Sequence, residues 1–247
     1  MSTTTLMGRR ILLRPLQPAD FEQWREVRRR NEDCFGLTGR PVTNDDGAVI
    51  ETARAPGGSL LAVVADGLGG HPCGDVASRV AVETLLACAP VDDTTLRQAV
   101  HSVNRAIVAA MREPGGAPTM GCTVAAALVR EGWVDVGNVG DSAGFVYTDS
   151  GLEKVTVDDV PVGDEGRTSV VTQTLGGGHV QLALHPHLAR VSVERPCRLL
   201  LCTDGLTNYV PEASITRALA QNHPRVAVDA LIGMALAAGS PDNVTVI

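Results

Sequence analysis

The chain has 247 residues, 44% of them hydrophobic and 20% charged, which is enough for a single α/β core of ordinary polarity. Its formal net charge of −7 at pH 7 argues against broad affinity for nucleic acid or anionic membranes. Aromatic residues make up only 3% of the chain, so the base-stacking platforms of single-strand nucleic-acid binders are not expected either.

The six cysteines occur singly, without a CxxC pair, and their spacing fits neither a zinc site nor a disulfide scaffold. Free thiols of this kind are typical of a reducing compartment. No apolar run approaches the roughly 20 residues of a membrane-spanning helix, and the N-terminus lacks the apolar stretch of a signal peptide. We therefore expect a soluble, cytoplasmic protein without nucleic-acid or membrane partners.

Residues 1–27 form a segment that differs from the rest of the chain. Ile11–Leu13 has the composition of a short strand, and Asp20 can cap a helix that carries Phe21 and Trp24 on one face. This piece resembles the opening of a GNAT-type acetyltransferase, but nothing downstream supplies the acetyl-CoA loop of that family. We interpret it as an atypical N-terminal segment with local similarity.

The most informative stretch is the apolar run Leu60–Ala65, which ends abruptly at Asp66. A short unbroken run of Leu, Val and Ala predicts a strand that is buried on both faces. The glycines that follow, beginning with Gly67, allow a tight turn and can bring backbone carbonyls close to a ligand. The stretch therefore predicts a rigid strand that presents one carboxylate at its end.

Three further acids stand at one end of a strand-like run, namely Asp141, Asp204 and Asp242. Several strand ends that each present an Asp can converge on one rim of a sheet. Like charges held close together repel, so either a pKa must rise or cations must neutralise the group. Carboxylate, carbonyl and water ligands suit Mg²⁺ or Mn²⁺. The sequence thus predicts a site for hard divalent cations.

Two consecutive pairs of amphipathic helices are predicted from apolar residues at helical spacing. The first pair comprises Asp75–Cys88 and a helix that Asp92 or Asp93 caps. The second pair comprises Glu212–Gln221 and Arg225–Ala238. Two consecutive amphipathic helices can cover one face of a sheet.

Alternating apolar segments separated by turns predict an antiparallel meander after the first helix pair. Its expected strands are Cys122–Val129, Val134–Val139, Phe145–Tyr147 and Leu152–Val157. Other expected strands are Cys34–Leu37, Val180–Leu184, Val191–Val193 and Arg198–Cys202. The order of strands and helix pairs predicts an α+β fold of two sheets with helices outside.

Six short blocks follow one another along the chain. They are Arg28–Asp33, Ala65–His71 with Gly74–Ser78, Gly121–Thr123, Asn138–Ser142, Leu201–Leu206 and Asp242–Val246. In this order they resemble the metal-dependent PPM/PP2C family of protein phosphatases, bacterial type. The resemblance covers residues 28–247 and implies a PP2C-like αββα four-layer sandwich, with two mostly antiparallel sheets flanked by helix pairs. The flap that family members carry beside the active site is shortened here, near residues 158–167.

The resemblance implies hydrolysis of phosphoserine and phosphothreonine in proteins by water shared between two Mg²⁺ or Mn²⁺ ions. The catalytic groups would be Arg28, which would bind the phosphate as a fork, and Asp66 and Asp204. The metal ligands would be Asp33, Asp66, the Gly67 carbonyl, Asp204 and Asp242, with Asp141 at a third, weaker ion. Glu32 and Asn243 would support these ligands without binding the metals.

Alternatives stay open at several of these positions. An Asp before Gly, such as Asp66 or Asp204, is also an ordinary turn-forming residue. A neighbouring arginine could bind the phosphate in place of Arg28. Alternatively, these arginines could form a solvated basic surface. His71 is a candidate general acid, but it follows Gly-Gly, whereas some family members have His directly after Asp-Gly, where this chain has Leu68. A loop-shaping role for His71 is the alternative.

The leading hypothesis is a metal-dependent serine/threonine protein phosphatase whose substrates are phosphorylated by a Ser/Thr kinase in the same cell. The first rival is a catalytically impaired PP2C-like module that binds phosphoproteins, motivated by the atypical segment before Arg28. A second rival, an acetyltransferase, rests on residues 9–30 alone.

Overall fold

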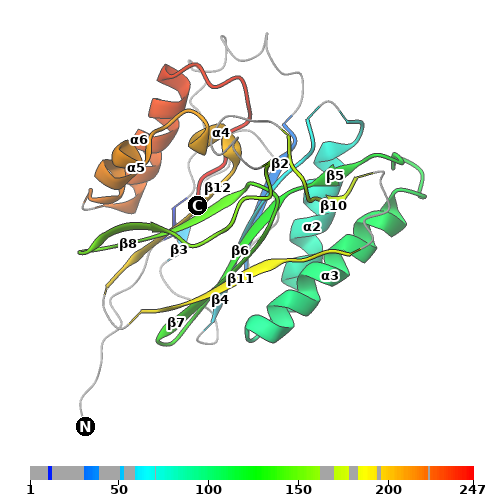
Figure 1. The fold of residues 1–247 in the computed structure, drawn as a ribbon, viewed down its shortest axis with the longest axis horizontal. Helices are drawn as coiled ribbons and strands as arrows, with labels where there is room; N and C mark the ends of the chain where they lie inside the picture. Colours follow the sequence, from blue (N-terminus) through cyan, green and yellow to red (C-terminus); the bar gives the residue numbers. More distant parts are fainter. Residues whose placement is uncertain are drawn as a thin grey trace.

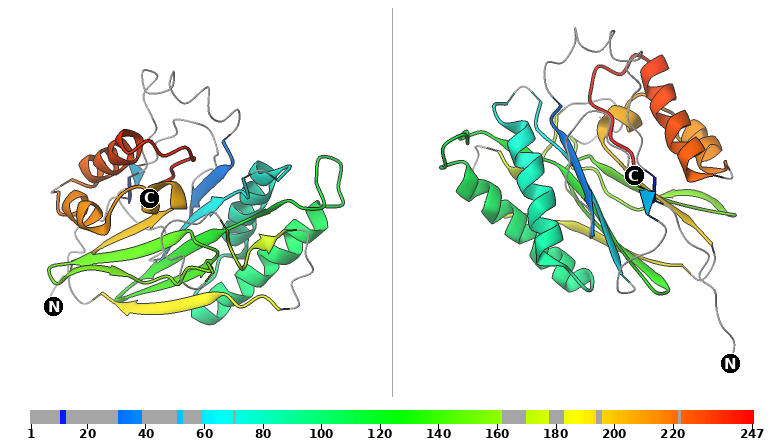
Figure 2. Two further views of the ribbon diagram at one scale, coloured as in Figure 1. Left: turned by 45° about the horizontal axis from the view of Figure 1, so that its top comes forward. Right: turned by 180° about the vertical axis from the view of Figure 1, so that it is seen from behind.

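Two antiparallel sheets pack face to face, and a pair of helices covers the outer face of each sheet (Figure 1). The computed structural model describes residues 11–12, 31–38, 51–52, 59–69, 71–161, 170–177, 183–193, 196–221 and 223–247. Figure 2 shows the two helix pairs on opposite sides of the sheets in both of its views. The predicted αββα layering is therefore confirmed.

The larger sheet has five strands in the order β11-β7-β6-β4-β2, and every neighbouring pair is antiparallel. In chain order these strands are β2 (Asp33–Leu37), β4 (Leu60–Asp66), β6 (Val124–Arg130), β7 (Trp133–Val139) and β11 (His187–Ser192). Helices α2 (Gly74–Cys88) and α3 (Asp93–Ala110) pack on its outer face.

The smaller sheet has the order β12-β8-β9, formed by β8 (Ala143–Thr148), β9 (Gly151–Lys154) and β12 (Arg198–Cys202). The C-terminal residues run beside β12, where Leu201 and Ile247 exchange backbone hydrogen bonds of 2.9 and 2.8 Å. Helices α5 (Glu212–Leu219) and α6 (Pro224–Ala237) cover the outer face, and the short α4 (Asp204–Thr207) follows β12 directly.

Two short strand pairs complete the described secondary structure. One pairs β5 (Gly121–Cys122) with β10 (Leu175–Gly176), and the other pairs β1 (Ile11–Leu12) with β3 (Glu51–Thr52). Among the described residues, no helix combines the length and the apolar character that crossing a membrane requires.

The residues of β4 explain why this strand is apolar throughout. Leu61, Val63 and Ala65 pack in the core beneath α2 and α3, whereas Ala62 and Val64 pack in the core between the two sheets. Successive side chains of a strand point to opposite faces. Because both faces of β4 are covered, a continuous apolar run is required, and the strand predicted at Leu60–Ala65 is confirmed.

Helix α3 begins where its sequence indicated. The Asp92 carboxylate accepts a hydrogen bond from the Thr95 backbone N–H at 2.8 Å, and the Thr95 hydroxyl oxygen accepts one from the Asp92 N–H at 2.9 Å. This reciprocal capping box satisfies donors that the first turn leaves open. The apolar stripe of α3 is buried at Leu96, Val100 and Val103.

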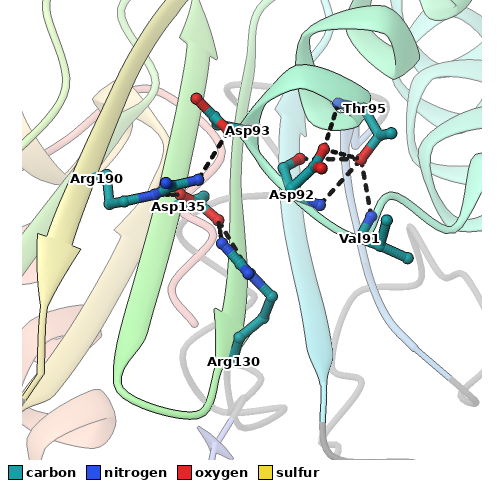
Figure 3. A network of polar contacts seen from close by, with 7 residues as sticks. All are labelled: Val91, Asp92, Asp93, Thr95, Arg130, Asp135 and Arg190. Atoms are coloured by element: carbon teal, nitrogen blue, oxygen red, sulfur yellow. Dashed lines mark hydrogen bonds and ion pairs between the residues drawn. The ribbon is translucent and has the colours of Figure 1, made fainter.

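A buried carboxylate on β7 ties the start of α3 to the larger sheet (Figure 3). Asp135 is fully buried and binds two guanidinium groups, those of Arg130 and Arg190. Arg190 also donates to Asp93 at 2.7 Å, in the first turn of α3. A buried charge is costly unless it is paired and hydrogen-bonded, so two arginines on neighbouring strands stabilise this position.

Most of the expected elements are present, with some changes of extent. The strand expected at Cys122–Val129 is divided between β5 and β6, because its neighbour on one side changes from β7 at Val124 to β10 at Cys122. Strand β11 begins at His187 rather than Val191, and β9 ends at Lys154 rather than Val157.

Other expectations fall wholly or partly outside the described residues. Residues 183–184 are not in a strand, and the remainder of the strand expected at Val180–Leu184 lies outside the described residues. Residues 162–167 of the flap predicted near residues 158–167, and the helix expected in residues 1–27, also lie outside the described residues. The division of the chain at residue 28 stays a prediction.

We expect Gly205→Ala to lower the free energy of unfolding by about 1–3 kcal/mol, the usual cost of overpacking. A Cβ at Gly205 would lie 2.0 Å from the Asn243 carbonyl oxygen, so α4 and the C-terminal segment would have to separate. As a control, Gly233 lies in α6, and a Cβ added there would meet no atom within 4 Å. Gly233→Ala should stabilise by about 0.5–1 kcal/mol, since glycine is unfavourable within a helix. Urea denaturation measures the free energy of unfolding of both variants. Similar effects of the two substitutions would contradict the expectation.

Candidate active site

Two carboxylates face each other at one end of the larger sheet. Asp33 begins β2, Asp66 ends β4, and the two are directly paired across the strands. Side chains at directly opposite positions have Cβ atoms about 4.5–5.5 Å apart, and like charges there are destabilising. The Gly67 N–H donates to the Glu32 carbonyl at 3.1 Å, which extends the pairing of the two segments beyond the carboxylates.

The smaller sheet holds Asp33 in place from the opposite side. The Oδ2 atom of Asp33 accepts hydrogen bonds from the Thr203 hydroxyl at 3.0 Å and from the Thr245 hydroxyl at 2.7 Å. Thr203 follows β12, and Thr245 lies in the C-terminal segment beside it. Asp33 is 1% exposed, so these bonds replace the water that its carboxylate would otherwise bind.

Asp204 and Asp242 bring two more negative charges to the same place. Asp204 is the first residue of α4, directly after Thr203, and Asp242 precedes the segment that pairs with β12. Burial, followed by the charges of Asp33, Asp204 and Asp242, raises the pKa of Asp66 well above its usual value. The four predicted carboxylate ligands therefore lie within electrostatic reach of one another, as the sequence predicted.

The pKa of Asp33 is raised to about 7, chiefly by burial. The hydrogen bonds from Thr245 and Thr203 oppose this increase, and the charges of Asp242 and Asp204 add to it. Asp33 is buried and the other three carboxylates are partly buried, so their mutual repulsion favours a compensating positive charge at this place.

The residues at this place fit a divalent cation. The Oδ1 atom of Asp33 is buried and has no hydrogen-bond partner among the described residues. Carboxylate oxygens together with a backbone carbonyl are the donors that Mg²⁺ and Mn²⁺ prefer. No group of three or more His, Cys, Asp or Glu side chains in the described part of the chain is arranged to hold an ion by itself. Water and the Gly67 carbonyl would therefore have to complete a coordination shell.

The backbone around the carboxylates is packed so closely that a side chain has no room at Gly67. A Cβ at Gly67 would lie 2.4 Å from the carbonyl carbon of Gly74, at the start of α2. The Ser78 hydroxyl of the same helix donates to the Glu32 carbonyl at 2.6 Å. The Asn243 side-chain oxygen accepts from the Glu32 N–H at 3.1 Å. Glu32 and Asn243 thus connect α2, β2 and the C-terminal segment behind the carboxylates.

Asp141 lies near Asp204, on the side of the smaller sheet. It is 9% exposed, and its pKa is raised to about 7 by burial first and by the charge of Asp204 next. The preceding Gly140 has φ +90°, a backbone conformation that favours glycine. The third predicted metal position therefore adjoins the other four carboxylates.

A network that the sequence did not reveal holds the turn before Asp141. The Asp159 carboxylate accepts from the Gly140 N–H at 2.8 Å and from the Gln173 amide at 2.9 Å. Its other oxygen lies 2.8 Å from the His187 Nε2 atom. The sequence carries no local signal for this group, because its members are separated by 14 to 28 residues.

Among the described residues, His71 is a predicted site residue that forms no ion pair with this group of carboxylates. His71 is exposed, and its backbone N–H donates to the Leu68 carbonyl at 3.2 Å. Arg28 lies outside the described residues, so its predicted contact with phosphate stays a prediction.

An αββα sandwich with clustered carboxylates at one end of its sheets defines a metal-dependent phosphatase of the PP2C type. Residues 41–235 match the family model described as protein phosphatase 2C. The serine/threonine phosphatase stp of Listeria monocytogenes serovar 1/2a is 31% identical over 229 residues, which are 84% of this chain and 90% of that protein. The chain belongs to the protein phosphatase 2C family, and through it to the serine/threonine phosphatases.

Relatives from Mycobacterium tuberculosis agree in sequence and in structure. The serine/threonine protein phosphatase PstP is 35% identical over 214 residues, covering 77% of this chain and 40% of that longer protein. The crystal structure of PstP/Ppp matches with a TM-score of 0.73 at 29% identity, over 98% of this chain and 97% of that chain. A structure of the PstP catalytic domain in complex with two manganese ions also matches, with a TM-score of 0.73 at 30% identity over the same shares of the two chains. The predicted family, fold and metal dependence are confirmed.

We expect Asp66→Asn to raise the unfolding temperature of the metal-free protein, because it removes one of several repelling charges. If the repulsion falls by about 1 kcal/mol, the unfolding temperature of a chain of this size should rise by roughly 2–4 °C. The same variant should lose most of the thermal stabilisation by Mn²⁺ that we expect for the wild type. Asp149→Asn is the matched control, since Asp149 is exposed in the β8–β9 turn. Scanning calorimetry with and without Mn²⁺ tests this, and an unchanged Mn²⁺ effect in Asp66→Asn would contradict it.

Asp159→Ala should destabilise the protein by about 2–3 kcal/mol, because it leaves the Gly140 N–H without its acceptor and removes the contacts with Gln173 and His187. Asp159→Asn keeps one acceptor oxygen and should cost less. Chemical denaturation compares the two variants. Ordinary surface substitutions change the free energy of unfolding by less than about 0.5 kcal/mol. If both variants lost less than this, the network would not stabilise the turn.

Proposed function

We propose that this chain hydrolyses phosphoserine and phosphothreonine in proteins, using divalent cations bound at the carboxylate cluster. The observation that carries the proposal is the meeting of Asp33 and Asp66 from one sheet with Asp204 and Asp242 from the segments beside the other. Membership of the protein phosphatase 2C family supports it.

In this proposal Asp66 would be the central ligand of the ions, and Asp33, Asp204, Asp242 and the Gly67 carbonyl would complete the protein ligands. When bound, two Mg²⁺ or Mn²⁺ ions supply positive charge that lowers the pKa of a water molecule and offsets the charge of the phosphoryl oxygens. The two manganese ions in the PstP catalytic domain support this assignment. Asp141 is proposed as a ligand of a third, weaker ion.

The chain's own residues fix where the reaction occurs. Thr203 and Thr245 orient one oxygen of Asp33 and leave the other available as a ligand. Because Asp66 ends a strand that is buried on both faces, its backbone has little freedom to move. Catalysis of phosphoryl transfer depends chiefly on positioning and charge, so rigid placement of these carboxylates supplies what the reaction requires.

Further roles are proposed for four other residues. Arg28 would bind the phosphate as a fork, and Glu32 and Asn243 would hold the ligand segments together. His71 is exposed on the turn that follows Asp66, where a loop-shaping role fits better than proton transfer. The catalytically impaired alternative has no observation in its favour, since every predicted carboxylate ligand is present.

We further propose that the substrates are products of a Ser/Thr kinase and that the protein acts in the cytoplasm. The names of the bacterial relatives, which are serine/threonine phosphatases, support the first point. The six cysteines, all of them free, fit a reducing compartment and support the second.

Wild-type protein with Mn²⁺ should hydrolyse p-nitrophenyl phosphate and a phosphothreonine peptide, and chelation of the metal should abolish both activities. Asp66→Asn should lower kcat/KM by at least about 100-fold, since removal of one charge-stabilising group typically costs this much. Asp149→Asn should retain wild-type activity. Steady-state assays measure these values. If wild-type protein with excess Mn²⁺ bound phosphopeptide without turnover, the impaired module would be the correct assignment.

A further inference from the structure

A cavity of about 290 Å³ lies beside the carboxylate cluster, against the smaller sheet. Asp141 and Asp204 form part of its wall, so it adjoins the place where a phosphoryl group would bind. The rest of the wall comes from β8, β9, the segment after β9, and helices α4 and α5. A peptide whose phosphorylated residue reached the cluster would therefore pass the cavity within a few residues, since an extended chain covers about 3.3–3.6 Å per residue.

Part of the cavity wall is apolar. Val160, Val210, Pro211 and Ile215 line it together with the ring of Phe145. Val210 and Ile215 belong to the core beneath α5 and α6, so this wall is held firmly in place. A wall of this kind can receive the methylene groups of a long side chain.

The charges around the cavity are predominantly negative. Asp141, Asp158, Asp204 and Glu212 line it, against a single cation, Lys154. The Lys154 ammonium donates to Asp158 and lies 5.9 Å from the centroid of the Phe145 ring. The positive charge of Lys154 is therefore neutralised by Asp158 and is not available to attract an anion.

Glu212 is the cavity carboxylate best placed to meet a substrate. It is exposed at the start of α5 and forms no ion pair with any described residue. Asp141 and Asp204, in contrast, would be occupied by cations in the working enzyme. Glu212 therefore supplies a negative charge at the mouth of a cavity with apolar walls.

We propose that this cavity binds an arginine side chain of the phosphoprotein substrate, close in sequence to the phosphorylated residue. The proposal rests on the phosphatase function proposed above and names part of its specificity. The methylene groups of the arginine would contact Val210, Pro211 and Ile215, and its guanidinium would pair with Glu212. An acidic side chain would be repelled, and an apolar one would leave the carboxylate without a partner.

Arginine suits this cavity better than lysine for two reasons. The guanidinium is planar, can form two parallel hydrogen bonds with one carboxylate, and is more weakly hydrated than an ammonium group.

The test compares phosphothreonine peptides that differ only by Arg, Leu or Glu within three residues on either side of the phosphorylated residue. Their kcat/KM values are measured with the 247-residue chain and Mn²⁺, each normalised to p-nitrophenyl phosphate hydrolysis by the same variant. We expect the best Arg peptide to exceed its Glu counterpart by about tenfold, the effect of one hydrogen bond to a charged group. Raising the ionic strength should reduce this ratio, because salt screens exposed charges.

Glu212→Gln should bring the ratio of Arg to Glu peptides close to one, and Glu212→Lys should invert it. Glu153→Gln is the matched control and should leave the ratio as in wild type, because Glu153 is exposed on β9 and does not line the cavity. Equal rates for all peptides, a preference for Leu, or a ratio that survives Glu212→Gln would overturn the assignment. Failure to hydrolyse p-nitrophenyl phosphate and every peptide would instead overturn the phosphatase function, and this assignment with it.

Discussion

Electrostatic repulsion between carboxylates is the constraint on which the structure of this protein depends. Asp33 and Asp66 are placed opposite each other by strand pairing, and burial raises the pKa of both. Asp204 and Asp242 add charge from the neighbouring segments. A fold selected for stability alone would have little reason to collect these groups in one partly buried place. In the function proposed above, divalent cations would offset this repulsion, so stability and activity would share one cause.

The sandwich supplies the rigidity that holds the charges together. Strand β4 is buried on both faces, and the core between the sheets includes Leu201 from β12 and Ile247 beside it. The two threonine hydroxyls on Asp33 then connect the carboxylate of one sheet to the backbone of the other. Since both sheets contribute to the site, a change in their packing would alter the distances between the carboxylates. Packing and chemistry are for this reason closely linked.

Different parts of the structure were predictable to different degrees. The strand Leu60–Asp66 and helix α3 have strong local signals, an unbroken apolar run in one case and a capping residue with a helical stripe in the other. The division of a predicted strand at Thr123 has no local signal, because it lies where the neighbouring strand changes from β7 to β10. The contact of Asp159 with His187 likewise depends on which strand lies at the edge of the sheet.

The sequence by itself determined the set of acidic residues, their positions at strand ends, and the order of strands and helix pairs, because these are encoded by residue type and local periodicity. Only the tertiary structure decided that Thr203 and Thr245 share one oxygen of Asp33, and that Asp204 also lines a cavity with Glu212. The physical reason is that contacts between segments far apart in the chain depend on how the two sheets pack. Residue type and periodicity describe a single segment and do not specify that packing.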